Sequence, residues 1–190
     1  NIVLMGMGEP LANYQQVITA LRLINHNQGL NIGSRRITVS TCGLVPEIKQ
    51  LAEEGLQFTL AVSLHAPNNK LRSQMMPIND RYPIEEVLAA CDYYSGETGR
   101  RVSFEYALVD GVNDSRTQAR RLAELLQGRL AHVNLIPVNQ VTEVEYSQPT
   151  NQVIEEFKEE LAAKNIPVSL RTERGADIDA ACGQLQSREG

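Results

Sequence analysis

The sequence predicts an α/β fold in which short strands alternate with amphipathic helices around a parallel sheet that forms an open or partial barrel. The first observation is the rhythm of β-rich runs and helical stretches along the chain. The second is the count: 190 residues provide about five strand–helix units and a final strand, whereas a closed eightfold barrel needs roughly 250 residues. A hydrophobic content of 42% fits one substantial core and favours a single domain.

The first half of the chain is predicted to contain three strands and two helices. Residues 2–5 have the composition of a buried strand, and the apolar residues from Tyr14 to Ile24 recur at helical spacing. A helix beginning at Pro46 is expected to stop near Gly55. The remaining elements of this half are a strand over 37–40, a nearly continuous apolar strand over 57–64 and a long polar loop over 65–81.

The second half repeats the alternation of helices and strands. One apolar helical face runs from Ile84 to Tyr94, and Val153, Ile154, Phe157 and Leu161 form the inner stripe of a helix over 151–164. The other predicted elements are a strand over 101–108, a helix over 117–126, a strand over 132–138 and a last strand over 168–171.

Charge and cysteine content exclude several classes of protein. Eighteen basic and 23 acidic residues give a net charge of −5, which excludes a generally basic nucleic-acid clamp. Cys42, Cys91 and Cys182 lie 49 and 91 residues apart (91 − 42 and 182 − 91), so they form none of the short-spaced pairs of metal sites, and their odd number argues against a disulfide scaffold. No apolar run reaches bilayer-spanning length, and a reducing, cytoplasmic compartment is expected.

The chain starts abruptly. Its first residues, Asn1 to Met5, already resemble a core strand and include no initiator methionine. We therefore expect a piece of a longer protein.

Candidate binding residues follow four of the predicted strands. Gly8 and Glu9 follow the first, Ser40 ends the second, Ser63-Leu64-His65 end the third, and Asn139 follows the fifth. Each has an ordinary alternative interpretation: a tight turn for the glycines, a helix cap for the hydroxyls, and a hydrogen-bonding loop residue for the histidine. Ligands of parallel α/β folds bind at the carboxyl ends of the strands, so together these residues predict one site.

The chemistry of this predicted site favours a particular kind of ligand. It offers one carboxylate, two serines, an asparagine and glycine backbone, with no Lys or Arg. Such a set suits a ligand with a positively charged amino group and hydroxyls, and does not suit a phosphate. The Gly6-Met7-Gly8-Glu9-Pro10-Leu11 turn lacks the third glycine of the dinucleotide fingerprint.

Cys182 is the candidate catalytic residue near the end of the chain. It lies between Ala181 and Gly183, and small neighbours would allow a bulky substrate to reach its thiol. The alternative is a buried structural cysteine, the commonest state of a free thiol. That interpretation is the one favoured for Cys91, on an apolar helical face, and for Cys42.

Four segments together resemble the RlmN/Cfr family of radical S-adenosylmethionine (SAM) RNA methyltransferases, and within it the RlmN branch. They are Gly6 to Leu11, Ser40-Thr41-Cys42-Gly43, Ser63-Leu64-His65-Ala66-Pro67-Asn68, and the tail from Arg174 to Leu185 with its Ala-Ala-Cys-Gly-Gln-Leu ending. The resemblance covers residues 1 to 185, and the tail is its most specific part.

The resemblance implies a fold and an activity. The fold is a partial (β/α)6 radical-SAM-type, TIM-like barrel, here truncated before its second strand, with a methyl-carrier tail over 167–190. The activity is methylation of carbon 2 of adenosine in large-subunit ribosomal RNA and in tRNA. One SAM methylates Cys182, and a radical generated from a second SAM activates that methyl group for transfer.

It also implies the cofactors, the partners and the roles of residues. SAM is bound by Gly8, Glu9, Ser40, Ser63, Leu64, His65 and Asn139. A [4Fe–4S] cluster is held by a CxxxCxxC loop and reduced by an electron-donor protein. These 190 residues contain neither that loop nor the family's resolving cysteine, so no metal ligand is predicted and the isolated segment is expected to be inactive. Its unpaired strand edge is expected to favour self-association.

Two alternative functions stay open from the sequence. One is a cluster-free module that binds SAM or a nucleoside and acts as an interaction domain. The other is an ordinary barrel enzyme of metabolism, which would need a phosphate site near the last strands. The stretch from Pro137 to Tyr146 has no Lys or Arg for such a site.

Overall fold

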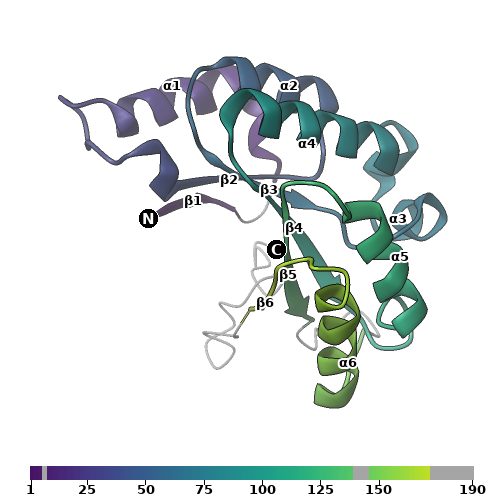
Figure 1. Ribbon diagram of the computed structural model, residues 1–190. Helices are drawn as coiled ribbons and strands as arrows, with labels where there is room; N and C mark the ends of the chain where they lie inside the picture. Colours follow the sequence, from purple (N-terminus) through teal and green to yellow (C-terminus); the bar gives the residue numbers. More distant parts are fainter. Residues whose placement is uncertain (6–7, 139–145, 172–190) are drawn as a thin grey trace, which may run out of the picture.

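The structure is a curved sheet of parallel strands with helices along its outer face (Figure 1). The computed structural model describes residues 1–5, 8–138 and 146–171. Within these residues the strands lie in chain order, from β1 to β6, and every neighbouring pair is parallel. The strands are β1 (Ile2–Leu4), β2 (Ile37–Thr41), β3 (Thr59–Ser63), β4 (Val102–Leu108), β5 (Ala131–Pro137) and β6 (Val168–Leu170).

The connections between strands are helical, as parallel neighbours require. The α-helices are α1 (Tyr14–Asn25), α2 (Val45–Glu53), α3 (Asn69–Met75), α4 (Ile84–Thr98), α5 (Arg116–Leu126) and α6 (Asn151–Ala162). Short 3-10 helices occupy η1 (Pro10–Asn13), η2 (Ser34–Arg36) and η3 (Pro77–Asp80). The partial parallel barrel predicted from the sequence is confirmed, and the sheet within the described residues is not closed, because it ends in β1 on one side and β6 on the other.

One sequence prediction is wrong. The long polar loop expected over 65–81 contains the helix α3 and the 3-10 helix η3. The helix α3 spans only seven residues and has no apolar stripe. It begins instead at a side-chain cap, because Asn68 Oδ1 accepts a hydrogen bond from the Leu71 backbone N–H at 2.9 Å. Hydrophobic periodicity cannot reveal a helix of this kind.

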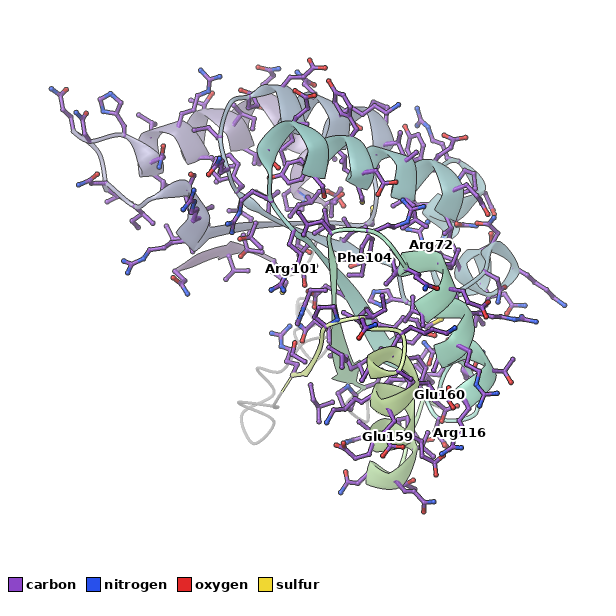
Figure 2. The ribbon with its side chains drawn as sticks, in the orientation of Figure 1. Arg72, Arg101, Phe104, Arg116, Glu159 and Glu160 are labelled. Atoms are coloured by element: carbon purple, nitrogen blue, oxygen red, sulfur yellow. The ribbon has the colours of Figure 1, made fainter. Side chains whose placement is uncertain are left out.

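The two faces of the sheet differ sharply in chemistry. The outward residues of β4, including Phe104 and Tyr106, are buried under the helices, and Phe104 is labelled in Figure 2. Alternate residues point to the concave side, and there β4 presents Ser103 and Glu105 while β5 presents Asn134. The interior of a closed eight-stranded barrel is filled by branched apolar side chains. A polar concave face therefore indicates a ligand cavity in place of a packed interior.

No helix among the described residues is long and apolar enough to cross a membrane.

Candidate functional site

A cavity of about 300 Å³ opens on the concave face at the carboxyl ends of the strands. Its lining comes from the turn after β1, from the ends of β2 and β3, from the strands β4 and β5, and from the residue after β6. The lining residues are Met5, Gly8, Glu9, Pro10, Ser40, Thr41, Cys42, Ser63, His65, Glu105, Ile136 and Arg171. The volume is at the lower end of the range for small-molecule sites.

Most of the sequence-predicted binding residues meet in this cavity. Gly8, Glu9, Ser40, Ser63 and His65 all contribute to its wall. The side chain of Leu64 does not, because it is fully buried in the hydrophobic core. Asn139 and Cys182 lie outside the described residues.

Glu9 is held in place by backbone donors. Its Oε1 accepts a hydrogen bond from the Leu11 N–H at 2.9 Å and caps η1, and its Oε2 accepts one from the Cys42 N–H at 2.6 Å. The carboxylate therefore ties the turn after β1 to the end of β2. A carboxylate has about four lone-pair directions, so two remain for a ligand. The preceding Gly8 has a φ of +100°, a conformation that glycine adopts without strain.

The segment after β2 supports its own turn. Thr41 Oγ1 accepts hydrogen bonds from the N–H groups of Gly43, at 3.1 Å, and of Leu44. Thr41 thus supports the turn before α2, but neither hydroxyl caps this helix, because its N-cap is Leu44 with no side-chain hydrogen bond. Ser40 faces the cavity. Burial and the neighbouring Glu9 carboxylate raise the pKa of the Cys42 thiol to about 12, so this thiol is protonated at neutral pH.

His65 has a strained backbone and a fixed ring. Its φ is +57°, which is uncommon for a residue other than glycine and is found at functional sites. Its carbonyl accepts a hydrogen bond from Nδ2 of the fully buried Asn113 at 2.8 Å. The ring nitrogen Nδ1 accepts one from the Ala107 N–H at 3.0 Å. Because Nδ1 accepts, the neutral ring carries its proton on Nε2, so Nε2–H is the hydrogen-bond donor of this side chain.

We expect His65 to stay neutral well below the ordinary histidine range. Burial, with a smaller contribution from the positive charge of Arg72, lowers its pKa from 6.5 to about 4. Between these values the unfolded chain binds one more proton than the folded protein, so stability falls as pH falls. At 1.36 kcal/mol per pKa unit the loss approaches about 3 kcal/mol near pH 4. Urea unfolding of the unchanged protein and of His65→Gln at pH 7 and 4.5 measures this loss of stability. An NMR titration midpoint of His65 near 6.5 would contradict the lowered pKa.

Arg72 is a functional-site neighbour that the sequence did not reveal. It lies on α3, is 0% exposed, and Figure 2 shows it within the body of the protein. Its Nη2 donates to the carbonyls of Cys42 at 2.7 Å and Ser63 at 3.3 Å, and its Nη1 donates to Asn79 Oδ1 at 3.0 Å and the Tyr82 carbonyl at 3.2 Å. One guanidinium therefore fastens the carboxyl ends of β2 and β3 to the segment beyond them.

Two further charged residues at the cavity were missed. Glu105 lies in the middle of β4, and Arg171 directly follows β6; both line the wall. The prediction that the rim has no Lys or Arg is therefore wrong. It was based on the residues following the strands most obvious in the sequence, and Arg171 was assigned to the last predicted strand. The sequence does contain a signal for Glu105: it is a charged residue between two aromatic residues, Phe104 and Tyr106, inside a predicted strand.

The described residues do not fit an iron–sulfur cluster. They contain no group of three His, Cys, Asp or Glu side chains placed to hold a metal ion. Cluster ligands are thiolates, and burial raises the pKa of the Cys91 thiol to about 12, as it does for Cys42. Cys91 is 2% exposed and packs in the core on α4, in line with its structural interpretation. No reaction step is assigned to a cluster on these residues.

The fold and site define a class of protein: an α/β partial barrel with a cavity for a small ligand on a polar concave face, at the carboxyl ends of parallel strands. The sequence profile of the radical SAM superfamily matches residues 1–123. The chain belongs to the radical SAM superfamily. Membership of this superfamily implies SAM and a [4Fe–4S] cluster as cofactors, and the described residues provide no ligand set for the cluster.

Curated relatives refine this assignment. A probable dual-specificity RNA methyltransferase RlmN from Clostridium novyi (strain NT) is 56% identical over 186 residues, covering 98% of this chain and 54% of the relative. Another from Thermoanaerobacter sp. (strain X514) is 50% identical over 188 residues, covering 99% of this chain and 55% of the relative. The resemblance to the RlmN/Cfr family is confirmed. The chain spans about half the length of these relatives.

Solved structures agree on the fold. A radical SAM methyltransferase from Sphaerobacter thermophilus superposes with a TM-score of 0.94 at 55% identity, covering 97% of this chain and 54% of that one. A domain of pyruvate-formate lyase-activating enzyme from Bacteroides vulgatus superposes with a TM-score of 0.67 at 18% identity, covering 90% of this chain and 98% of that one. The second likeness concerns the fold alone.

Proposed function

We propose that this chain is the SAM-binding barrel of a dual-specificity RNA methyltransferase that methylates carbon 2 of adenosine in large-subunit ribosomal RNA and in tRNA. The observation that carries the proposal is the convergence of Gly8, Glu9, Ser40, Ser63 and His65 on one cavity. These are the residues to which the family resemblance assigns SAM, and relatives of that name are 50% to 56% identical to the chain.

Each residue has a role that follows from its geometry. Glu9 accepts hydrogen bonds from the amino group of SAM through the lone pairs that the backbone leaves free. Ser40 and Ser63 offer hydroxyls, and His65 donates from Nε2 to an acceptor on the ligand. Asn139 is proposed to add a further contact, and Cys182 to carry the methyl group. The chemistry that a cluster would supply in the whole protein is an electron for SAM, and none of the described residues is assigned as its ligand.

Partners and location follow from the same proposal. Ribosomal RNA and tRNA are the substrates, and a separate electron-donor protein reduces the cluster in the cytoplasm. The net charge of −5 argues against this chain as the main RNA-binding surface, and it leaves RNA possible as the substrate of the whole protein. The strand β1 lies at an edge of the sheet, and self-association through it stays a prediction.

A titration with SAM tests the binding site. We expect millimolar SAM to shift the backbone amide NMR signals of Glu9, Cys42, Ser63 and His65. Glu9→Gln should weaken binding by about tenfold or more, because a charge-assisted hydrogen bond becomes a neutral one. The matched control is Glu160→Gln, on α6 in the outer layer (Figure 2), which removes the same charge from an exposed ion pair with Arg120.

The titration also separates the two functions. Weak, millimolar affinity in the absence of a cluster fits the methyltransferase, because a bound cluster would supply part of the ligation of SAM. Micromolar affinity without a cluster would favour the cluster-free binding module. Equal affinity of the Glu9→Gln and Glu160→Gln variants would contradict the assignment of Glu9.

A further inference from the structure

Asn113 is a buried polar residue that the proposed site does not use. It lies in the turn between β4 and α5, it is 0% exposed, and it is not among the residues that line the cavity. An asparagine is seldom fully buried unless its amide is hydrogen-bonded to other groups of the protein. The partners of this amide therefore indicate what the residue does there.

The amide of Asn113 joins two segments that are far apart in the sequence. Its Oδ1 accepts a hydrogen bond from the Val109 N–H at 2.8 Å, and its Nδ2 donates to the Ala107 carbonyl at 2.6 Å. These two bonds close the turn itself. Nδ2 also donates to the His65 carbonyl at 2.8 Å, 48 residues earlier in the chain. The turn after β4 is thereby fastened to the segment after β3.

His65 has a backbone conformation that needs such support. Among the described residues other than glycine, only Asn31, His65 and Asn165 have a positive φ, and asparagine is one of the few residues that adopt this conformation routinely. A histidine keeps it only where the surrounding structure enforces it. Part of that enforcement comes from β4, because the His65 N–H donates to the Glu105 carbonyl at 3.3 Å and the Ala107 N–H donates to the ring Nδ1 at 3.0 Å.

These contacts leave one polar group of His65 for a ligand. The N–H, the carbonyl and Nδ1 are all bonded to β4 or to the turn after it, and the residue lines the cavity. The remaining group is Nε2–H. Of the three contacts, only the bond to the carbonyl comes from a side chain, that of Asn113, so it is the one that a substitution can remove.

The hydrophobic core fixes the place of Asn113. The Tyr106 hydroxyl donates to the Asn113 carbonyl at 2.8 Å, and Tyr106 is 0% exposed. Its ring packs against Phe157 of α6, with the ring centroids 5.2 Å apart. The position of Asn113 is therefore set by the core, and the amide in turn holds a residue of the cavity wall.

We propose that Asn113 is a positioning residue: its bond to the His65 carbonyl holds His65 in the left-handed conformation in which the ring presents Nε2–H to the cavity. Asn113 itself touches no ligand. The hold on the His65 backbone follows from the contacts within the chain, whereas the consequence for ligand affinity rests on the proposed function, in which the cavity binds SAM. A change at Asn113 is therefore expected to weaken SAM binding through His65.

Asn113→Ala tests this role with two measurements. The first is the tautomer of the His65 ring at neutral pH, from its ¹⁵N NMR signals. The unchanged protein should show the Nε2–H tautomer and Asn113→Ala a mixture, because the ring is no longer held at the Ala107 N–H. The second is SAM affinity, from backbone amide NMR signals. Asn113→Ala should weaken binding about tenfold, and when added to His65→Ala it should weaken binding by about twofold at most.

Tyr94→Phe is the matched control for the loss of a buried hydrogen bond. The Tyr94 hydroxyl donates to the Phe58 carbonyl at 2.8 Å, and Tyr94 lies on α4 and is 0% exposed. We expect this variant to be less stable than the unchanged protein, but to keep the His65 tautomer and to bind SAM within about twofold of the original affinity. A merely structural role of Asn113 would give the same result for Asn113→Ala.

Several results would overturn the proposal. One is a mixture of His65 tautomers in the unchanged protein, a measurement that needs no variant to fold. Another is a folded Asn113→Ala protein that keeps the tautomer or the SAM affinity of the unchanged protein, or a Tyr94→Phe protein that loses the tautomer as well. A third is an equal loss of SAM affinity from Asn113→Ala with and without His65→Ala. If SAM does not bind even the unchanged protein, the proposed function fails, and the tautomer comparison still decides whether Asn113 holds His65.

Discussion

Arg72→Met is expected to lower the free energy of unfolding by about 4 kcal/mol, a large fraction of the stability of a small domain. The guanidinium donates to four oxygen atoms that lie 7 to 30 residues away in the sequence, on Cys42, Ser63, Asn79 and Tyr82. Leaving a buried acceptor without its donor costs about 1–3 kcal/mol. Methionine fills much of the same volume, so the loss of unfolding free energy comes mainly from the missing hydrogen bonds and only in small part from a cavity.

Two comparison variants make the Arg72 prediction specific. Arg72→Lys keeps the positive charge but cannot reach the same set of acceptors with one planar group, so we expect it to recover less than half of the loss. Arg120→Met removes an exposed arginine that pairs with Glu160 at 2.8 Å and should change stability by less than about 1 kcal/mol. Denaturant unfolding of the three variants provides the measurement. If Arg72→Met loses no more unfolding free energy than Arg120→Met, the stabilising role given to the four Arg72 hydrogen bonds is wrong.

Cys182→Ala is expected to abolish methylation of RNA altogether. In the proposed function this thiol carries the methyl group that is transferred to adenosine, and no other side chain of the chain replaces it. Burial keeps the Cys42 and Cys91 thiols protonated at neutral pH, and a protonated thiol is a poor nucleophile. The measurement is the content of C2-methylated adenosine in ribosomal RNA and tRNA, by mass spectrometry, from cells whose gene carries the substitution.

Cys91→Ala is the matched control for Cys182→Ala. It removes a sulfur atom from the core of the outer layer on α4, away from the cavity lining. We expect slightly reduced stability and unchanged methylation. Full methylation with Cys182→Ala, or its complete loss with Cys91→Ala in protein that remains folded, would contradict the role given to Cys182.

The architecture was predictable from the sequence because its strands and larger helices have regular patterns. The strand predicted over 57–64 is a nearly continuous apolar run and forms β3, and the helix predicted over 151–164 has a clear apolar stripe and forms α6. Because parallel strands end at one edge, the residues that follow them could be assigned to one site in advance. Glu9, Ser40, Ser63 and His65 do meet there.

The contacts that hold this site together could not be predicted in the same way. Arg72 lies in a polar segment without periodicity, and its burial depends on the Cys42 carbonyl 30 residues away. The inward direction of Glu105 follows from the register of β4 with β3 and β5. Such a register is a property of the assembled sheet. A short polar helix and a carboxylate within a strand therefore became visible only in three dimensions.

The central claim is that this cavity serves adenine-C2 methylation of RNA, and deletion of the gene tests it most directly. C2-methylated adenosine is quantified by mass spectrometry in ribosomal RNA and in tRNA from deleted and undeleted cells. The proposed function predicts that the modification disappears from both RNAs and returns when the unaltered gene is restored. Unchanged amounts of the modification in both RNAs after deletion would contradict it.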